Sequence, residues 1–225
     1  MVLGIDFVKK FEKTKVMKRL ALMLIGFAGF STVYTSCTKD PINNLSADES
    51  RIYITNHDST VNFTNYKTYS ISDSVAVIEN GKSTRELTDV GQAYIDAVKK
   101  YMDQAGYQMV SKSASPDLGV DVNHIINTTT GVISYGDYWG NYGGYWDPYY
   151  WGYPDYGYYI PYAYSVYQIK EGAMSVDLLD LKNASSDHKI NIIWTGLIRG
   201  SGIFTTSVAD AQVKALFDQS SYLKH

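Results

Sequence analysis

The stretch that decides the fold is Glu171–Ile198, which reads EGAMSVDLLDLKNASSDHKINIIWTGLI. It contains two apolar blocks rich in β-branched and aromatic residues, a composition that is typical of strands. The polar run Asn183–Asp187 separates the two blocks and predicts a turn. We therefore predict that Val166–Leu181 and Ile190–Ile198 form a hairpin.

Further strands are predicted on the N-terminal side of this hairpin. Apolar and polar residues alternate within Arg51–Ser72 and again within Leu118–Ile126, as in strands that bury one face. A shorter apolar run, Tyr107–Val110, predicts another strand, and Pro116-Asp117 marks the turn that follows it. The chain is therefore expected to build a sheet from several sequential strands.

Two helices are expected to cover this sheet. Ser83-Thr84-Arg85-Glu86 matches a capping box, and Gly106 is suited to end the helix that follows. The apolar residues between them lie on one helical face: Leu87, Val90, Tyr94, Val98, Tyr101 and Ala105. A second helix is predicted to begin at Ser207 with Asp210, and its apolar stripe comprises Ala209, Val213, Leu216 and Phe217. This order of elements favours an α+β fold, a two-layer sandwich with both helices on one face of a mostly antiparallel sheet.

The N-terminus has the pattern of an export signal. Lys18-Arg19 precedes the uncharged run Leu20–Phe30, and Tyr34-Thr35-Ser36 leads to Cys37. An uncleaved membrane anchor is the alternative, but the apolar run is shorter than the roughly 20 residues that a membrane span needs. We expect residues 1–36 to be a signal peptide, with Met17 as an alternative start.

This leader resembles bacterial lipoprotein signals, which implies that Cys37 becomes the lipidated first residue of the mature protein. Fatty acyl chains such as palmitate would then hold the protein on the membrane without help from the folded domain. Residues 37–50 would form a tether and residues 51–225 a single domain. Thr38-Lys39-Asp40 partly resembles the surface-export tag of Bacteroidetes lipoproteins. The expected location is the outer membrane, on its periplasmic side rather than at the cell surface.

Composition narrows the possible functions. Removing the leader leaves 189 residues with 14 basic and 21 acidic side chains, a formal charge of −7. That charge repels nucleic acid and anionic membrane surfaces. Because Cys37 is the only cysteine, the domain has no internal disulfide and no redox or zinc-thiolate site.

An aromatic insertion at residues 132–165 is the segment best suited to function. Thirteen of the 21 tyrosines lie between Gly131 and Tyr167, among glycines and prolines that forbid a long helix or a central strand. Such rings offer broad contact area at low entropic cost, as in antibody loops. The candidate binding residues are Tyr138, Trp139, Tyr142, Tyr145, Trp146, Tyr149, Tyr150, Trp151, Tyr153, Tyr156, Tyr158 and Tyr159.

The ligand class follows from the charges of this insertion. No Lys or Arg occurs from Ser113 to Ile169, so a neutral glycan or a protein partner fits better than a phosphorylated ligand. The alternatives are a solvated low-complexity loop that drapes over the sheet, or self-association through the rings.

Catalytic and metal motifs are weak in this sequence. His57, His124, His188 and His225 are scattered, without the close spacing of zinc ligands, and no cofactor motif is recognised. Asp177 and Asp180 are the most suggestive carboxylates, but they stand an odd number of strand positions apart and are expected to diverge. We expect Asp177 to line a solvated face and Asp180 to begin the turn, and we expect no enzyme activity.

Several sequence blocks resemble a bacterial lipoprotein family called domain of unknown function 4136, of Bacteroidetes type. The blocks are Phe63-x-x-Tyr66-Lys67-Thr68-Tyr69, Ala105-Gly106-Tyr107, Pro116-Asp117-Leu118-Gly119-Val120, Glu171–Asp180 and Ile193-Trp194-Thr195-Gly196. The resemblance spans most of Ile52–Phe217 and implies a secreted or lipid-anchored α+β domain with no established activity.

The leading interpretation is a lipid-anchored, non-catalytic envelope protein that presents its aromatic loop for binding or scaffolding. The alternatives are a hydrolase of envelope polymers that uses Asp177 or Asp180, and an accessory factor of an outer-membrane complex. Deletion of Asp137–Tyr164 is expected to leave a folded domain that no longer captures its partner.

Overall fold

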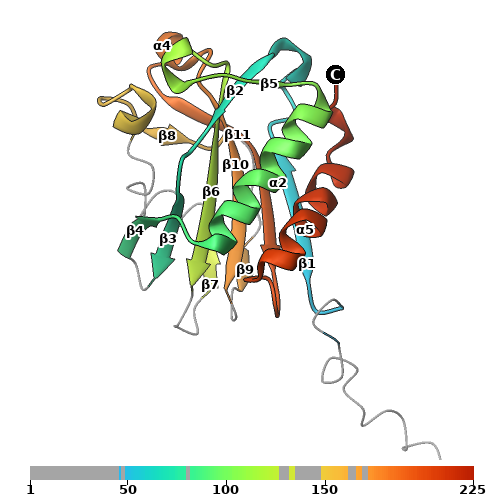
Figure 1. The fold of residues 1–225 in the computed structure, drawn as a ribbon. Coiled ribbons are helices and arrows are strands. Elements are labelled where there is room, and N and C mark those ends of the chain that lie inside the picture. Colours follow the sequence, from blue (N-terminus) through green and yellow to red (C-terminus); the bar gives the residue numbers. More distant parts are fainter. Residues whose placement is uncertain are drawn as a thin grey trace, which may run out of the picture. The chain divides into compact units, whose positions relative to one another are not determined.

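The computed structural model describes residues 46, 49–79, 82–126, 132–134, 148–161, 166–168 and 172–225 (Figure 1). These residues belong to one folded unit, Ser46–His225. Among the helices in this part of the chain, none is both long and apolar enough to cross a bilayer.

Three long antiparallel strands form the middle of the sheet: β6 (Leu118–Ile126), β10 (Ala173–Asp180) and β11 (Ile190–Arg199). The predicted hairpin is confirmed, because β10 and β11 pair over their length with one irregularity between Leu178 and Leu179. Its first strand is shorter than predicted. Val166–Gln168 is a separate strand, β9, which pairs with β7 (Val132–Ser134) in a second small sheet.

The remaining strands make the sheet mixed at its edges. On one side, β1 (Ile52–His57) pairs antiparallel with β11. On the other, β2 (Thr68–Ile71) and β3 (Val75–Glu79) lie one after the other along β6, both parallel to it. The outer strands are β4 (Lys82–Glu86), antiparallel to β3, and β5 (Gln108–Met109), parallel to β2. The longest pairings are thus antiparallel, as predicted.

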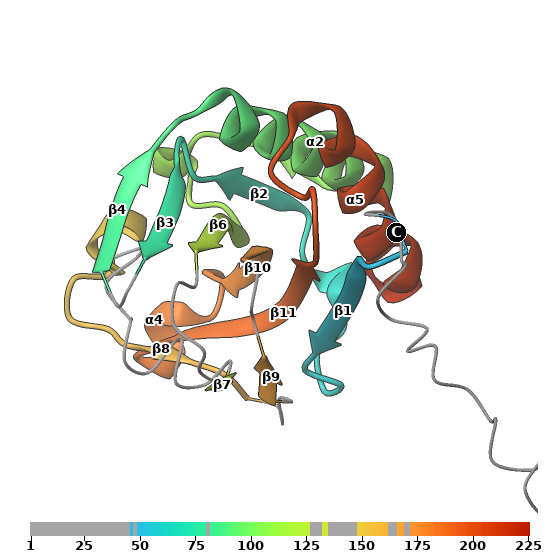
Figure 2. The same cartoon turned by 90° about the horizontal axis from the view of Figure 1, so that it is seen from below.

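Both long helices, α2 (Asp89–Ala105) and α5 (Thr206–Gln219), cover the same face of the sheet (Figure 2). The predicted stripe of α5 is buried, and together with the α2 face it packs on β6, β10 and β11. A short helix, α4 (Ala184–Asp187), lies in the β10–β11 connection. Single 3-10 turns complete the fold at Phe63–Asn65, Lys112–Ala114, Pro148–Trp151 and Ser221–Leu223. The α+β sandwich is therefore confirmed.

The predicted start of the first helix is wrong. Residues 82–86, which contain the supposed capping box, form β4 because they pair with β3 in register. The helix instead begins after Thr88, whose Oγ1 accepts a hydrogen bond of 3.1 Å from the Gly91 amide. Leu87 consequently lies outside the helix and is 53% exposed. The predicted stop is confirmed, because Gly106 adopts a left-handed conformation with φ 102°.

The opposite face of the sheet carries a second apolar core rather than a solvated surface. Ile78, Ile125, Leu179 and Leu197 are buried there, from four different strands. Trp151, only 5% exposed, packs into this core. The sheet is therefore covered on both faces, by helices on one and by part of the aromatic insertion on the other (Figure 2).

Candidate functional site

Residues Pro148–Pro161, here called the aromatic segment, are the described part of the predicted insertion between β7 and β9. This segment contains seven of the candidate binding residues: Tyr149, Tyr150, Trp151, Tyr153, Tyr156, Tyr158 and Tyr159. The other candidates lie outside the described residues: Tyr138, Trp139, Tyr142, Tyr145, Trp146 and the lipidation residue Cys37.

The aromatic segment is held to the sheet by specific contacts. The ring of Trp151 lies over Gly119, where a Cβ would approach it to 3.2 Å, so a larger residue at position 119 would push the ring outward. The hydroxyl of Tyr153 donates to the Leu181 carbonyl at 3.1 Å. Further along, β8 (Tyr158–Tyr159) pairs in parallel with the start of β11. This part of the insertion is therefore an ordered cover on the sheet and not a solvated linker.

Two rings of the segment are exposed. Tyr149 is 71% exposed and Tyr159 is 49% exposed, and they lie near opposite ends of the segment. Hollows of about 410 and 490 Å³ are both lined by Trp151 and Gly152. Tyr149 lines the first hollow, and Tyr153 lines the second. The segment thus combines a buried anchor with exposed rings.

Cations from distant parts of the sequence lie over the rings of Tyr150 and Tyr159. The Nζ of Lys112 lies 3.7 Å from the ring centroid of Tyr150, and the guanidinium of Arg85 lies 5.2 Å from the same centroid. Lys189 Nζ lies 3.9 Å from the ring centroid of Tyr159. The insertion has no Lys or Arg of its own, but Arg85, Lys112 and Lys189 lie beside its rings. The composition of the insertion could not predict these neighbouring cations.

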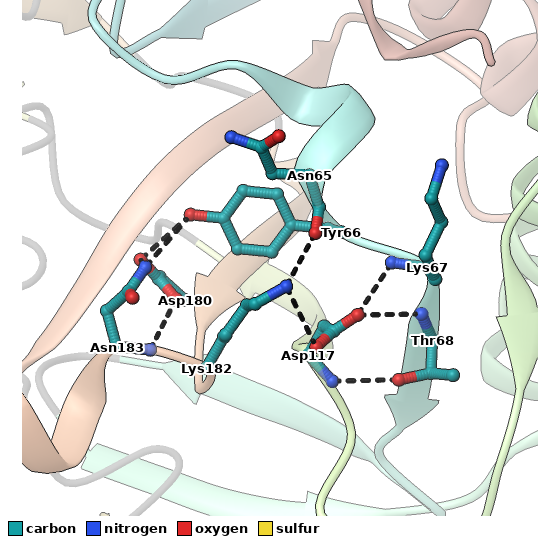
Figure 3. Close-up of polar contacts among 8 residues, drawn as sticks. All are labelled: Asn65, Tyr66, Lys67, Thr68, Asp117, Asp180, Lys182 and Asn183. Atoms are coloured by element: carbon teal, nitrogen blue, oxygen red, sulfur yellow. Dashed lines mark hydrogen bonds and ion pairs between the residues drawn. The ribbon is translucent and has the colours of Figure 1, made fainter.

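A polar network at one end of the sheet joins three of the sequence blocks (Figure 3). Asp117 accepts hydrogen bonds from the backbone amides of Lys67 at 2.7 Å and Thr68 at 3.2 Å. Lys182 forms an ion pair with Asp117 at 3.6 Å and donates to the Asn65 carbonyl at 2.6 Å (Figure 3). These contacts tie the chain before β2 to the starts of β6 and of the β10–β11 connection.

Asp180 belongs to the same network and begins the turn, as predicted. Its carboxylate accepts from the Tyr66 hydroxyl at 2.9 Å and from the Asn183 side chain and backbone at 2.7 and 3.0 Å (Figure 3). Burial, reinforced by the Asp180 charge, raises the pKa of Tyr66 above its usual value. Tyr66 therefore stays protonated and remains a donor to Asp180.

Asp177 is not on a solvated face, contrary to the prediction. It is fully buried on the face of the second core and stands in register with Asp121 of β6, which is also fully buried. Asn123 donates to Asp177 at 2.8 Å, and Ser175 donates to it at 3.2 Å. As predicted from their spacing, Asp177 and Asp180 diverge, since Asp180 bonds to Tyr66 of the first core.

Asp121 is the more unusual member of this buried pair. Among the described residues, neither of its carboxylate oxygens has a hydrogen-bond partner. Burial, and then the neighbouring Asp177 charge, raise its pKa well above the usual range, while Trp151 and Arg85 act more weakly in the opposite direction. Each acid stands between two apolar residues of its strand, the alternation that predicts a solvated face for the acid, and neither the second core on that face nor the pairing of the two strands could be read from the sequence.

The histidines do not form a metal centre among the described residues, where no group of three potential ligands is assembled. Each ring packs against an aromatic neighbour instead. His57 stacks on Tyr222 with ring centroids 3.9 Å apart, and His124 lies 4.0 Å from Phe204.

Comparisons with known proteins agree with the sequence resemblance. The chain matches the family model described as domain of unknown function (DUF4136) over residues 54–220. Its structure is similar to a crystal structure of a DUF4136 family protein from Bacteroides thetaiotaomicron VPI-5482, with 26% sequence identity and a TM-score of 0.65. That match covers 79% of this chain and 99% of the other. No curated protein matches the chain significantly.

Proposed function

Since the chain belongs to the DUF4136 family, a domain of unknown function, we propose that it is a non-catalytic, lipid-anchored binding domain of the bacterial cell envelope. The aromatic segment is its binding surface, and a neutral glycan or a protein is its partner. The observation that carries this proposal is the exposure of Tyr149 and Tyr159 on a segment anchored by buried Trp151.

The physical argument concerns the cost of ordering a binding surface. An aromatic ring on a flexible loop loses entropy when it binds, which weakens the affinity that its contact area can supply. Here the Trp151 anchor and the β8 pairing hold the backbone before any partner arrives. The exposed rings are therefore pre-organised and can contribute most of their contact energy to binding.

The membrane anchor rests on the leader that ends before Cys37. The folded unit needs no membrane-binding surface of its own, because two acyl chains already give stable attachment. We place the domain at the outer membrane and favour its periplasmic side.

The hydrolase alternative has less support from the geometry. A general acid must reach the scissile bond, yet Asp177 is fully buried and Asp180 is 4% exposed and occupied by Tyr66 and Asn183. The accessory-factor alternative differs from the leading proposal only in its partner, which would be an outer-membrane complex. The cross-linking measurement described next also tests this alternative.

The experiment compares wild-type protein with Tyr149→Ala and Tyr159→Ala. Binding is measured by co-sedimentation with insoluble envelope glycans and by cross-linking in gently solubilised membranes. We expect each substitution to weaken binding by about tenfold, equivalent to about 1.4 kcal/mol. Ile52→Ala is the matched control, because it also removes an exposed apolar side chain, from β1. β1 lies at the opposite edge of the sheet from β3 and β4. Ile52 also pairs with Arg199, at the far end of β11 from Asn191, the register partner of Tyr159. Equal binding by all four proteins would disprove the proposal.

A further inference from the structure

A polar pocket of about 360 Å³ lies at the end of the sheet where β1 finishes and the β10–β11 connection turns. Its walls come from three distant parts of the chain: the turn after β1, the end of the aromatic segment, and residues 180–193. We call it the end pocket. The side chains that concern us are Asp58, Asn62, Asn65, Tyr159, Asp187 and Asn191.

The walls of the end pocket are fixed by contacts within the protein. Asp58 accepts from the amide and hydroxyl of Thr60 at 2.9 and 2.7 Å. Asp180, which also lines the pocket, is held by Tyr66 and Asn183 (Figure 3). Tyr159 stands in register with Asn191 through the β8–β11 pairing. A ligand would therefore meet a pre-formed surface.

The pocket also contains polar atoms without partners. Asn191 donates to Asp187 at 2.8 Å, but its side-chain oxygen is buried and has no hydrogen bond among the described residues. Buried polar atoms normally have a partner, and a small shift of this side chain would let the oxygen accept from a ligand hydroxyl in the pocket. No hydrogen bond to the side-chain amide of Asn65 is found among the described residues. The backbone of Asn65 is bonded, because its carbonyl accepts from Lys182 and its amide donates to the Asn62 carbonyl at 3.1 Å.

These groups define the chemistry of the ligand. Hydrogen-bond acceptors and donors line the same pocket as the ring of Tyr159. Sugar hydroxyls both donate and accept hydrogen bonds, and the C–H face of a sugar packs on aromatic rings. Three carboxylates line the pocket, Asp58, Asp180 and Asp187, against one cation, Lys189, which lies over the Tyr159 ring. An anionic ligand would be repelled. The volume is at the lower end of the range for small-molecule sites, about 300–1,000 Å³, and suits one or two sugar rings.

We infer that the end pocket binds a neutral saccharide unit. Asn65 and Asn191 hydrogen-bond to its hydroxyls, and Tyr159 packs on one face of the ring. This inference rests on the proposed binding function for its ligand class, but it places saccharide recognition in a pocket and not on the exposed ring of Tyr149.

The test can use the chain from residue 46 onward, because the residues of both cores lie between Phe63 and Leu223. Nitrogen-15-labelled protein is titrated with glucose, galactose, mannose and N-acetylglucosamine, and with glucuronate as the charged comparison. We expect at least one neutral sugar to shift the side-chain amide signals of Asn65 and Asn191, and glucuronate to bind more weakly.

Substitutions decide whether the sugar occupies this pocket. Tyr159→Ala and Asn65→Ala should each weaken sugar binding by about tenfold, while Ile52→Ala, which removes an exposed apolar side chain outside the pocket, should change it by less than about twofold. The inference is overturned if no neutral sugar shifts the asparagine signals, if glucuronate binds best, or if Ile52→Ala weakens binding as much as Tyr159→Ala does. Failure here together with Tyr149-dependent binding of an envelope partner would leave the proposed function standing, so the two ideas can be separated.

Discussion

Replacing Trp151 with alanine tests whether the aromatic segment is part of the folded core. A tryptophan buries about 150–250 Å² and each Å² contributes about 25 cal/mol, so full burial contributes at most about 4–6 kcal/mol. Tryptophan-to-alanine changes in cores cost about 3–5 kcal/mol. Trp151 is 5% exposed but lies on a surface segment that can relax, so we expect a loss of about 3 kcal/mol.

The measurement is urea-induced unfolding followed by circular dichroism, together with hydrogen exchange of residues 148–161. For a domain of this size the loss corresponds to a decrease in melting temperature of about 6–12 °C. Tyr149→Ala is the matched control, since its ring is 71% exposed, and it should change stability by less than about 0.5 kcal/mol. A Trp151→Ala variant that loses less than about 1 kcal/mol and keeps its exchange protection would refute this reasoning.

Three further predictions follow from the buried groups. Burial raises the pKa of Asp121, so the folded state favours its protonated form and the wild type loses stability as the pH rises from about 4. Asp121→Asn should therefore raise the melting temperature more at pH 8 than at pH 5, because only the carboxylate loses stability as the pH rises. An equal gain at both pH values would contradict this. Tyr66→Phe removes the hydrogen bond to Asp180 and should cost about 1–3 kcal/mol in urea titrations, whereas a neutral effect would show that the bond contributes nothing. Gly196→Ala would bring a Cβ within 2.7 Å of Leu216 and should lower the free energy of unfolding by about 1–3 kcal/mol, measured by calorimetry. Gly157→Ala is the control and should be nearly neutral, because no described atom lies within 4 Å of the added Cβ. Similar losses at both sites would argue against overpacking.

The structure also changes the design of one experiment. From sequence, deletion of Asp137–Tyr164 is expected to leave a folded domain. Because that deletion removes Trp151 from the second core, it would uncover part of that core on the sheet, including the surface over Gly119. Loss of binding by the deletion protein would then follow from loss of structure, so single substitutions at exposed rings are the sharper test.

Local patterns predicted the residues that face the layer of helices. The alternation in β6 identified Val120 and Val122 as buried residues, and the stripe of α5 identified Val213 and Leu216. These predictions succeeded because the period of the apolar residues records which side of an element packs on that layer. The solvated face that the same alternation implied for β6 is wrong, because Asp121 and Asn123 are buried as well. The α2 start failed because residues 82–86 have a β3 partner, and that pairing overrides the local capping signal.

The candidate site was only partly accessible to sequence reasoning. Composition singled out the insertion, but it could not show which rings are anchors and which are exposed, because that depends on contacts of Trp151 with Gly119 and Leu181. Nor could it place Asp121 opposite Asp177, since strand order is not encoded in the alternation of either strand. The end pocket could not be predicted either, because three regions that are distant in the sequence form its walls.

The direction of β1 has a mechanical consequence for a tethered protein. Ile52, next to the proposed tether, pairs with Arg199 at one end of the sheet, whereas the strand finishes at His57 beside the end pocket at the other. Tension between a membrane anchor and a partner held in that pocket would pull along β1. The hydrogen bonds between β1 and β11 would then all bear the force at once, in shear. A strand loaded in this way resists force better than a strand whose hydrogen bonds break one after another.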